Sequence, residues 1–409
     1  MIDAENLYKL LTNLPPQVFR DFVMGEFSVA LAETDQKQNK TEQRSALEVQ
    51  LNALAIAPRQ RMEEVAERIT QLCDGAGQDV IKGIRNQIGG PANRATFDKI
   101  TNQYERALWI FCNNQHLFKV ALDARQADIF RQSSHCYSGF VSTKHLVVKD
   151  DDLSKTAFHA SAALKLGCTA TDIVVQIFKR LRPDAKSGED VDLYQISIHH
   201  NQSPEMVDYV ENSALVPQEV IRAISSHITY EPENGHLEVM SRETDAREGL
   251  ARLVADELLK HPITGERIPL KVYDYQCLAG SHALDLAGEM IASVKVIELG
   301  YNIADHRSML VKIWPKDADD IYTVALTLIG PTFDFRHHTL NYVRLSLRTM
   351  KTPGERARNI SIVLREDNKC NVKTKREKDR ALCDRLLAKW KLIKEIGETS
   401  HEADDAVPA

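Results

Sequence analysis

The sequence lacks the features by which secreted, membrane-spanning and metal-stabilised proteins are recognised. Its seven cysteines are widely spaced, with no C-x-x-C pair, so we expect buried free thiols and neither a structural metal nor disulfides. No apolar run approaches the roughly 20 residues that cross a bilayer. The first residues carry acids, and no apolar segment follows them as it would in a secretory signal. These absences predict a cytoplasmic protein without membrane contact.

Motifs for cofactor or nucleotide chemistry are also missing. There is no G-x-x-x-x-G-K-[ST] sequence, and Gly75–Gly77 lacks both a preceding strand and a third glycine at the proper spacing. Ala279–His282 does not fit G-x-S-x-G. The doublets His199-His200 and His337-His338 each offer at most one ligand to a given metal, because neighbours on a strand face opposite sides. We therefore assign no catalytic residue, no metal site and no cofactor.

What is present is an ordinary globular composition in a chain long enough for two domains. Of the 409 residues, 43% are hydrophobic and 27% are charged. Residues 1–133 show helical spacing of apolar residues, including one long pattern from Phe97 to Phe111, and no strand signal. We expect a helical bundle over 1–133, an α+β domain over 134–396 and a short acidic disordered tail over 397–409.

Strand patterns begin after residue 137. The apolar runs 173–181 and 192–200 predict a hairpin, and Asn234-Gly235 predicts a turn between 224–230 and 236–240. A helix is expected around Leu250, and 294–299, 309–313 and 321–328 are further strand candidates. Because strands and helices do not alternate regularly, the fold class is α+β with mixed or antiparallel sheets.

The C-terminal part has the clearest pattern. Residues 343–347 and 360–364 alternate apolar and polar side chains around a loop at 351–358, which predicts a hairpin. Thr374 and Glu377 fit a capping box, so a helix is expected from there to about Glu395. One side of that helix carries a cationic stripe made of Lys378, Arg385 and Lys389.

Charge is unevenly distributed. The net charge is −6, but residues 344–394 contain 16 Lys/Arg and 6 Asp/Glu, a difference of +10. Such asymmetry indicates either a partner that carries phosphates or an internal interface between acidic and basic parts. For the first alternative the candidate nucleic-acid-binding residues are Arg344, Arg348, Lys351, Arg356, Arg358, Lys378, Arg385 and Lys389. DNA and RNA stay open, and aromatic residues for base stacking are scarce in this segment.

Three segments carry a resemblance. Leu10–Phe22 (LLTNLPPQVFRDF) resembles the opening of helical effector-associated adaptor modules of bacterial conflict systems. Ala66–Gly77 and Asn371–Lys378 are similar to uncharacterised bacterial proteins of mobile islands. The resemblance implies a setting in antiviral defence or mobile-element biology and a protein partner for the helical domain, and it implies no catalytic activity.

Two hypotheses follow. The first is a non-enzymatic interaction protein whose helical domain binds a protein partner and whose basic C-terminal part contacts nucleic acid. The alternative is a metal-dependent nuclease whose carboxylates come from separate strands, with Glu231, Glu238 and Lys271 as residues that a fold could bring together.

Overall fold

The structure, a computed structural model, describes residues 4–395 apart from 34–38, 134, 184–188, 212, 264–266, 268–270, 304–306, 317–318, 331–336 and 353–355. The chain divides into two compact units, residues 1–129 with 177–181 and residues 130–176 with 182–409. The domain boundary expected at residue 133 lies close to the first break. The tail expected over 397–409 lies outside the described residues.

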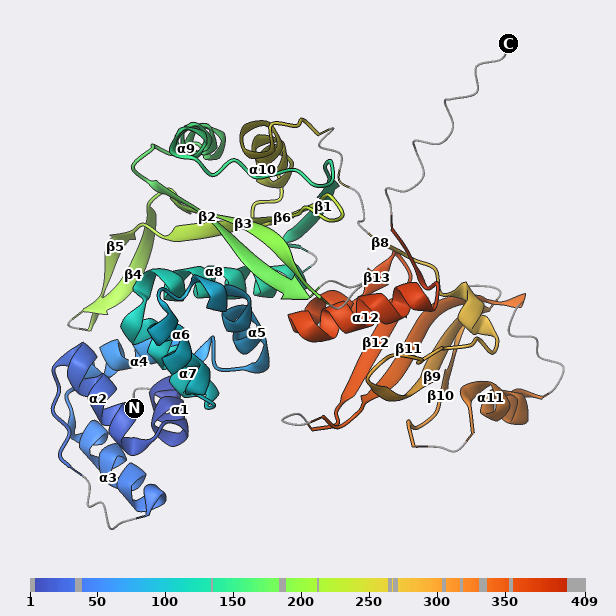
Figure 1. Cartoon of the computed structure of the whole chain (residues 1–409), viewed down its shortest axis with the longest axis horizontal. Helices are drawn as coiled ribbons and strands as arrows, with labels where there is room; N and C mark the ends of the chain where they lie inside the picture. The colour runs from blue at the N-terminus through green and yellow to red at the C-terminus, as the bar shows by residue number, and fades with distance from the viewer. Residues whose placement is uncertain are drawn as a thin grey trace. The chain divides into compact units, whose positions relative to one another are not determined.

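The first unit consists mainly of helices (Figure 1, blue to teal). They are α1 Glu5–Asn13, α2 Pro16–Phe27, α3 Lys40–Ala53, α4 Ile56–Thr70, α5 Gly75–Ile84, α6 Pro91–Lys99, α7 Gln103–Asn113 and α8 Gln115–Gln132, whose last residues belong to the second unit, with a 3-10 turn at Arg85–Gln87. The side chain of Asp74 caps α5 by accepting from the backbone N–H of Gly77. Apolar faces of these helices share one buried core, which includes Leu10, Phe19 and Phe118.

A short strand segment, residues 177–181, belongs to this helical unit. Its Phe178 packs into the helical core, and Arg180 pairs with Asp128 at 3.2 Å. Gly83 on α5 comes so close that a Cβ there would lie 2.5 Å from the carbonyl oxygen of Leu181. Only glycine allows this approach, which holds the segment against α5.

The second unit contains two five-stranded sheets. The first sheet has the order β1-β7-β6-β3-β2. Its strands are β1 Tyr137–Val141, β2 Ile173–Pro183, β3 Asp190–Asn201, β6 Ala223–Glu231 and β7 His236–Met240, and residues 177–181 of β2 are the segment that belongs to the first unit. The covering helices are α9 Asp152–Leu166 and α10 Ala246–Leu253, which continues as a π-helical turn at Val254–Leu259 (Figure 1). The side chains of Ile196, Ile228 and Leu237 are buried on one face, and those of Ser197, His227 and Thr229 on the other. Both faces of this sheet are therefore buried.

The hairpin expected at Asn234-Gly235 is confirmed. β6 and β7 pair antiparallel, with Ile228 opposite Val239, and Gly235 takes a φ of 73°, which suits the glycine of a tight turn. β2 and β3 are neighbours in the sheet, as the expected hairpin requires, and their connection at 184–188 lies outside the described residues. A further hairpin, β4 Glu205–Glu211 with β5 Ala214–Val220, was not expected.

The second sheet has the order β10-β9-β11-β12-β13. Its strands are β9 Ile291–Ile303, β10 Arg307–Lys312, β11 Thr339–Thr349, β12 Asn359–Arg365 and β13 Lys369–Cys370 (Figure 1, orange to red). The helices α11 Ile321–Ile329 and α12 Glu377–Lys389 accompany it, with 3-10 turns at Gln276–Ala279 and Asn371–Thr374 and a separate strand pair β8 Lys271–Tyr273 and β14 Ile393–Glu395. Leu345 and Leu347 of β11 share a buried core with Leu386 and Trp390 at α12.

The expected fold class is confirmed as α+β, and the C-terminal hairpin is confirmed as β11 paired with β12. The strand expected over 321–328 is wrong, because that segment is the helix α11. The side chain of Asp320 accepts from the backbone N–H of Thr323 and caps this helix. Ile321 and Ala325, one turn apart, are its buried residues. A helix and a short apolar strand are hard to distinguish by periodicity alone.

The capping box expected at Thr374 is also wrong. The hydroxyl of Thr374 donates to the carbonyl of Asn371 in a 3-10 turn, and α12 begins at Glu377 without a side-chain cap. The helix ends at Lys389 rather than near residue 395, because Lys391 adopts a φ of 59° and directs the chain into β14.

Two further expectations need correction. The long pattern from Phe97 to Phe111 is two helices, α6 and α7, separated at Asn102, whose side chain caps α7. All seven cysteines are free thiols, but only Cys73 and Cys383 are buried, and Cys112 and Cys277 are exposed. Among the described residues no helix is both long enough and apolar enough to cross a membrane.

Candidate nucleic-acid interface

The second sheet has one face that is not buried. On β11 the residues Val343, Leu345 and Leu347 are buried, so the alternate residues Arg344 and Arg348 lie on the opposite face. The register extends that face across the sheet. Its residues are Glu298 and Lys295 of β9, Leu310 and Lys312 of β10, Tyr342, Arg344, Ser346 and Arg348 of β11, and Ser361, Val363 and Arg365 of β12.

We call this surface the open face. It carries five cationic side chains, Lys295, Lys312, Arg344, Arg348 and Arg365. One carboxylate, Glu298, lies among them and is 7% exposed. Lys312 and Arg344 each approach Glu298 at 3.2 Å from neighbouring strands. The described part of the open face therefore has a net charge of about +4 from these ionisable side chains.

Glu298 is kept ionised by its surroundings. Burial opposes its charge, but the hydrogen bond from the Tyr342 hydroxyl, the neighbouring Lys312 and the positive charge of Arg344 together lower the pKa of this carboxyl. Burial and the same hydrogen bond raise the pKa of Tyr342, which stays a neutral phenol. Because its carboxylate bonds to Lys312 and Arg344 at the same time, Glu298 holds these two side chains side by side on the open face.

Two aromatic rings accompany the cations. The Arg365 guanidinium lies 5.3 Å from the ring centre of Tyr342. The Lys312 ammonium lies 5.8 Å from the ring centre of Trp314, which follows β10 and is 71% exposed. Opposite Tyr342 stands Gly300, where a Cβ would come within 2.9 Å of the Tyr342 Cβ. A side chain at Gly300 would push the Tyr342 ring away, so the glycine keeps this part of the face flat.

The structure divides the cationic residues singled out in the sequence between two sides of the second sheet. Arg344 and Arg348 lie on the open face. Lys351 and Arg356 are exposed beyond the ends of β11 and β12, where residues 353–355 lie outside the described part. Arg358 pairs with Asp379 of α12, on the side of the sheet where the helix packs.

The stripe on α12 is engaged in ion pairs. Arg385 makes a two-pronged contact with Glu289, with its closest approach at 2.9 Å, and Lys389 pairs with Asp285 at 2.9 Å. Lys378 is exposed at the start of the helix. Since α12 packs on the buried face of the sheet, this stripe and the open face are on opposite sides of it. The hairpin and the helix therefore do not present one continuous cationic surface.

Three cations of the open face, Lys295, Lys312 and Arg365, were missed by reasoning from the sequence. Arg365 continues the alternation of β12, and Lys312 lies within the segment 309–313 that was expected as a strand. The signal that would have found them is the register between β9, β10 and β11. Pairing of strands distant in sequence is not readable from a local pattern.

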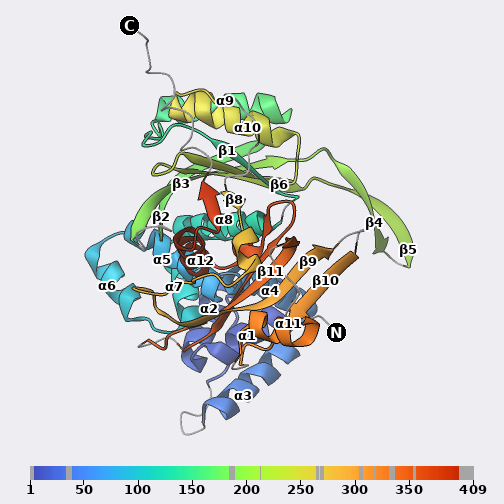
Figure 2. The same cartoon turned by 90° about the vertical axis from the view of Figure 1, so that its right-hand side faces the viewer.

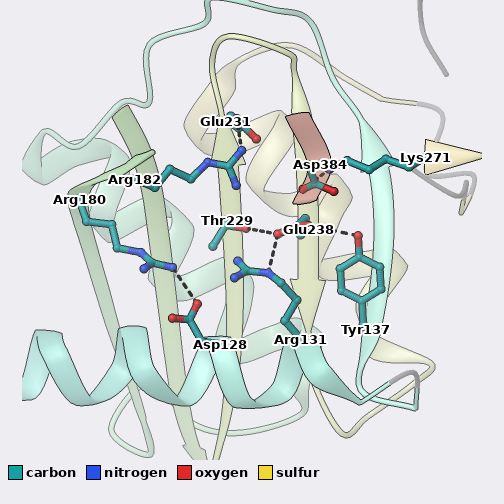
Figure 3. A network of polar contacts seen from close by, with 10 residues as sticks. All are labelled: Asp128, Arg131, Tyr137, Arg180, Arg182, Thr229, Glu231, Glu238, Lys271 and Asp384. Carbon is teal, nitrogen blue, oxygen red and sulfur yellow. Dashed lines mark hydrogen bonds and ion pairs between the residues drawn. The ribbon is translucent and has the colours of Figure 1, made fainter. Parts of the chain in front are cut away.

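The residues weighed as a nuclease site lie in a polar network on the first sheet and its surroundings (Figure 3). Glu238 of β7 accepts from the Arg131 Nε at 3.0 Å, the Tyr137 hydroxyl at 3.2 Å and the Thr229 hydroxyl at 3.1 Å. Burial opposes its charge, but the positive charges of Arg131, then of Arg380 and Arg182, lower its pKa far below the usual value of 4.5. Burial above all raises the pKa of Tyr137.

The other two members are engaged in the same way. Glu231 pairs with Arg182, and Lys271 pairs with Asp384 at 2.7 Å. Because the Glu238 carboxylate stays ionised and the Tyr137 hydroxyl stays protonated, neither group can exchange a proton with a substrate near neutral pH. What this arrangement does chemically is to fix buried charges in pairs.

Metal ligands do not gather in the described ranges. His199 bonds to Ser225 at 2.8 Å, and His200, on the opposite face of β3, lies 3.8 Å from Glu243. Within the part of the chain that the structure describes, no group of three or more His, Cys, Asp or Glu side chains is placed to hold a metal ion.

Comparison with models of protein families and with curated proteins gives no match for the chain.

Proposed function

We propose that the protein is a non-enzymatic nucleic-acid-binding protein that holds a single strand of RNA or DNA on the open face. The observation that carries this proposal is the gathering of five cations, with Tyr342 and Trp314, on one exposed face of an antiparallel sheet. Cations track a phosphate backbone, and exposed rings stack on unpaired bases. A flat sheet that carries aromatic side chains is a known platform for single strands.

The cationic stripe on α12 is a weaker candidate for binding nucleic acid than the open face. Arg385 and Lys389 already neutralise Glu289 and Asp285, so a phosphate would have to displace a carboxylate there. On the open face Arg348 and Arg365 are exposed, and Glu298 is the one carboxylate among the residues of this face that the structure describes. Duplex nucleic acid fits less well, because paired bases offer no ring faces to Trp314. This favours the open face and a single strand.

The salt dependence of binding tests the proposal. Contacts to five phosphates of a single strand give a slope of about −3.5 in log K against log salt. Affinity should then fall about 100-fold between about 50 and 200 mM salt. The probes are fluorescein-labelled oligo(U) and oligo(dT) of about 20 nucleotides and a duplex of equal length, followed by fluorescence anisotropy. RNA and DNA are thereby distinguished.

A matched pair of variants locates the site. The triple variant Lys312→Gln, Arg348→Gln and Arg365→Gln leaves two cations, so its slope should fall to about −1.4 and its affinity at low salt should drop. The control carries the same number of neutralisations at Lys144, Lys149 and Lys165, on the segment from β1 through α9 of the first sheet, and should bind like wild type. Absence of binding at 50 mM salt, or equal loss in the control, would refute the proposal.

The helical unit is part of the same proposal as the binding site of a protein partner in antiviral defence or mobile-element biology. Its support is the resemblance of Leu10–Phe22 to adaptor modules. A second support is that the helices α2, α3 and α4 each carry an apolar side chain that is at least 54% exposed, namely Met24, Val49 and Ile56. Such side chains are suitable for contact with a helix of a partner.

A further inference from the structure

The hairpin β4–β5, residues 205–220, is an exposed arm. The arm continues outward from the neighbouring strands β3 and β6 (Figures 1 and 2). At its base the Gln202 N–H donates a hydrogen bond to the Arg222 carbonyl. In the described part of the chain its strands pair with each other and with no further strand. None of its described residues is buried. An isolated two-stranded hairpin is only marginally stable in water, so an arm of this kind is suited to packing against another surface.

One side of the arm combines apolar and acidic side chains. The register places Met206, Val210 and Leu215 on one face, with exposed fractions of 62%, 72% and 70%. Asp208 and Glu219 lie on that same face. Residues 205–220 contain four acids and no lysine or arginine. The arm therefore repels nucleic acid and a second arm, and it selects a surface that is cationic and partly apolar.

The open face has that chemistry. Besides its five cations it carries Leu310, which is 61% exposed, and Trp314 lies at its edge. In the chain itself the apolar side chains of the arm are exposed to solvent, so the arm is not docked on an open face within one chain. We propose that the arm of one copy docks on the open face of a second copy of this chain, with Met206, Val210 and Leu215 against Leu310 and Trp314, and Asp208 and Glu219 beside Lys312 and its cationic neighbours.

The contact is heterologous, since two different surfaces meet, and it therefore allows chains longer than a dimer. Each arm strand has seven residues and spans about 23 Å at 3.3 Å per residue. A two-stranded face of this length is smaller than the roughly 800 Å² per partner of a standard stable interface. Association is consequently weak, and it has to be sought at high protein concentration and low salt.

Sedimentation velocity of the full chain, free of nucleic acid, is the test. Between about 2 and 200 µM the weight-average sedimentation coefficient should rise with concentration at about 50 mM salt, and association should weaken at least about tenfold at 300 mM salt. The variant Asp208→Lys with Glu219→Lys should stay monomeric. The matched control, Glu205→Lys with Glu211→Lys, makes the same change of charge on the other side of the arm and should associate like wild type.

A charge exchange completes the test. The variant Lys312→Glu with Arg365→Glu should be monomeric alone, and it should associate when mixed with the Asp208→Lys, Glu219→Lys chain, because each then offers the other a complementary surface. A monomeric wild type at 200 µM, an equal loss in the control, or a mixture that stays monomeric would overturn the proposal. None of these outcomes depends on nucleic acid, so binding of oligonucleotides with a monomeric wild type would leave the proposed function standing alone.

Discussion

Replacing Glu238 by glutamine is the most direct perturbation of the first sheet. The substitution keeps the shape of the side chain and removes its charge. Glu238 is 13% exposed and Arg131 is 3% exposed, so the substitution takes this carboxylate away from the guanidinium in a nearly water-free site. Removing one member of a buried ion pair costs about 3–5 kcal/mol. Glutamine keeps one side-chain oxygen, so one of the Tyr137 and Thr229 hydroxyls can still donate to it, and the other can accept from the amide N–H. The lost charge therefore dominates.

Hydrogen exchange measured by mass spectrometry on peptides from β6 and β7 reports this loss locally. A reduction of about 3 kcal/mol in the opening free energy corresponds to exchange about 150-fold faster. The matched control is Glu233→Gln, the same replacement at an exposed position of the same hairpin, and it should leave the rates unchanged. If exchange at β6 and β7 in Glu238→Gln quickened less than about fivefold, the pair would not be holding the sheet as we infer.

The same variant has a defined pH dependence. The folded-state pKa of Glu238 is lowered, so its contribution to stability is present above the unfolded value of 4.5 and is lost as the pH falls below that value. The difference in opening free energy between wild type and Glu238→Gln should therefore be constant from pH 7 to about 5 and shrink by about 1.4 kcal/mol per pH unit below 4.5. A difference that grew on acidification would contradict the assigned direction of the pKa shift.

Three further predictions concern other parts of the molecule. Arg385→Gln should leave oligonucleotide affinity unchanged in anisotropy titrations and lower the thermal midpoint, because its guanidinium serves Glu289. Trp314→Ala should weaken oligonucleotide binding by about 1–3 kcal/mol for one lost stacked base while the salt slope in the same titrations stays at the wild-type value. Gly83→Ala should destabilise the helical unit, because the added Cβ would lie 2.5 Å from the Leu181 carbonyl oxygen. Urea unfolding followed by circular dichroism measures this loss, and an unchanged midpoint would show that the backbone shifts to accommodate the methyl group.

Local patterns predicted the elements whose signal lies within a few residues. Strict alternation identified β11 and β12, and with them Arg344 and Arg348, since one buried face fixes where every second side chain points. Asn234-Gly235 identified the β6–β7 turn because glycine readily adopts the positive φ that a tight hairpin turn requires. The helix α11 was mistaken for a strand, because its nine residues are nearly all apolar or β-branched and show no clear period.

Distant contacts decided the rest of the candidate site. Lys312 and Lys295 belong to the open face only through pairing of β9 with β10 and β11. The partners of α12, Glu289 and Asp285, lie about 100 residues before the helix in the chain, and no local pattern connects them. The arm β4–β5 gives a weak strand signal, because it contains Pro217. It also stands outside both five-stranded sheets, and its described residues form no buried face that would impose an alternation of apolar and polar residues.

The distribution of charge in the C-terminal part acquires a physical meaning from these pairings. A segment of +10 within a chain of net charge −6 can be a binding surface or one side of an internal interface. The second sheet separates these two roles between its faces. On the helix side Arg358, Arg385 and Lys389 meet carboxylates of the same unit, which is an internal interface. On the other side one enclosed carboxylate, Glu298, holds Lys312 and Arg344 together without neutralising the face. Salt screens the interaction between exposed charges beyond a Debye length of about 10 Å, so a phosphate close to the protein is affected mainly by nearby charges. A face of about +4 can therefore attract a nucleic-acid strand although the whole chain is negative.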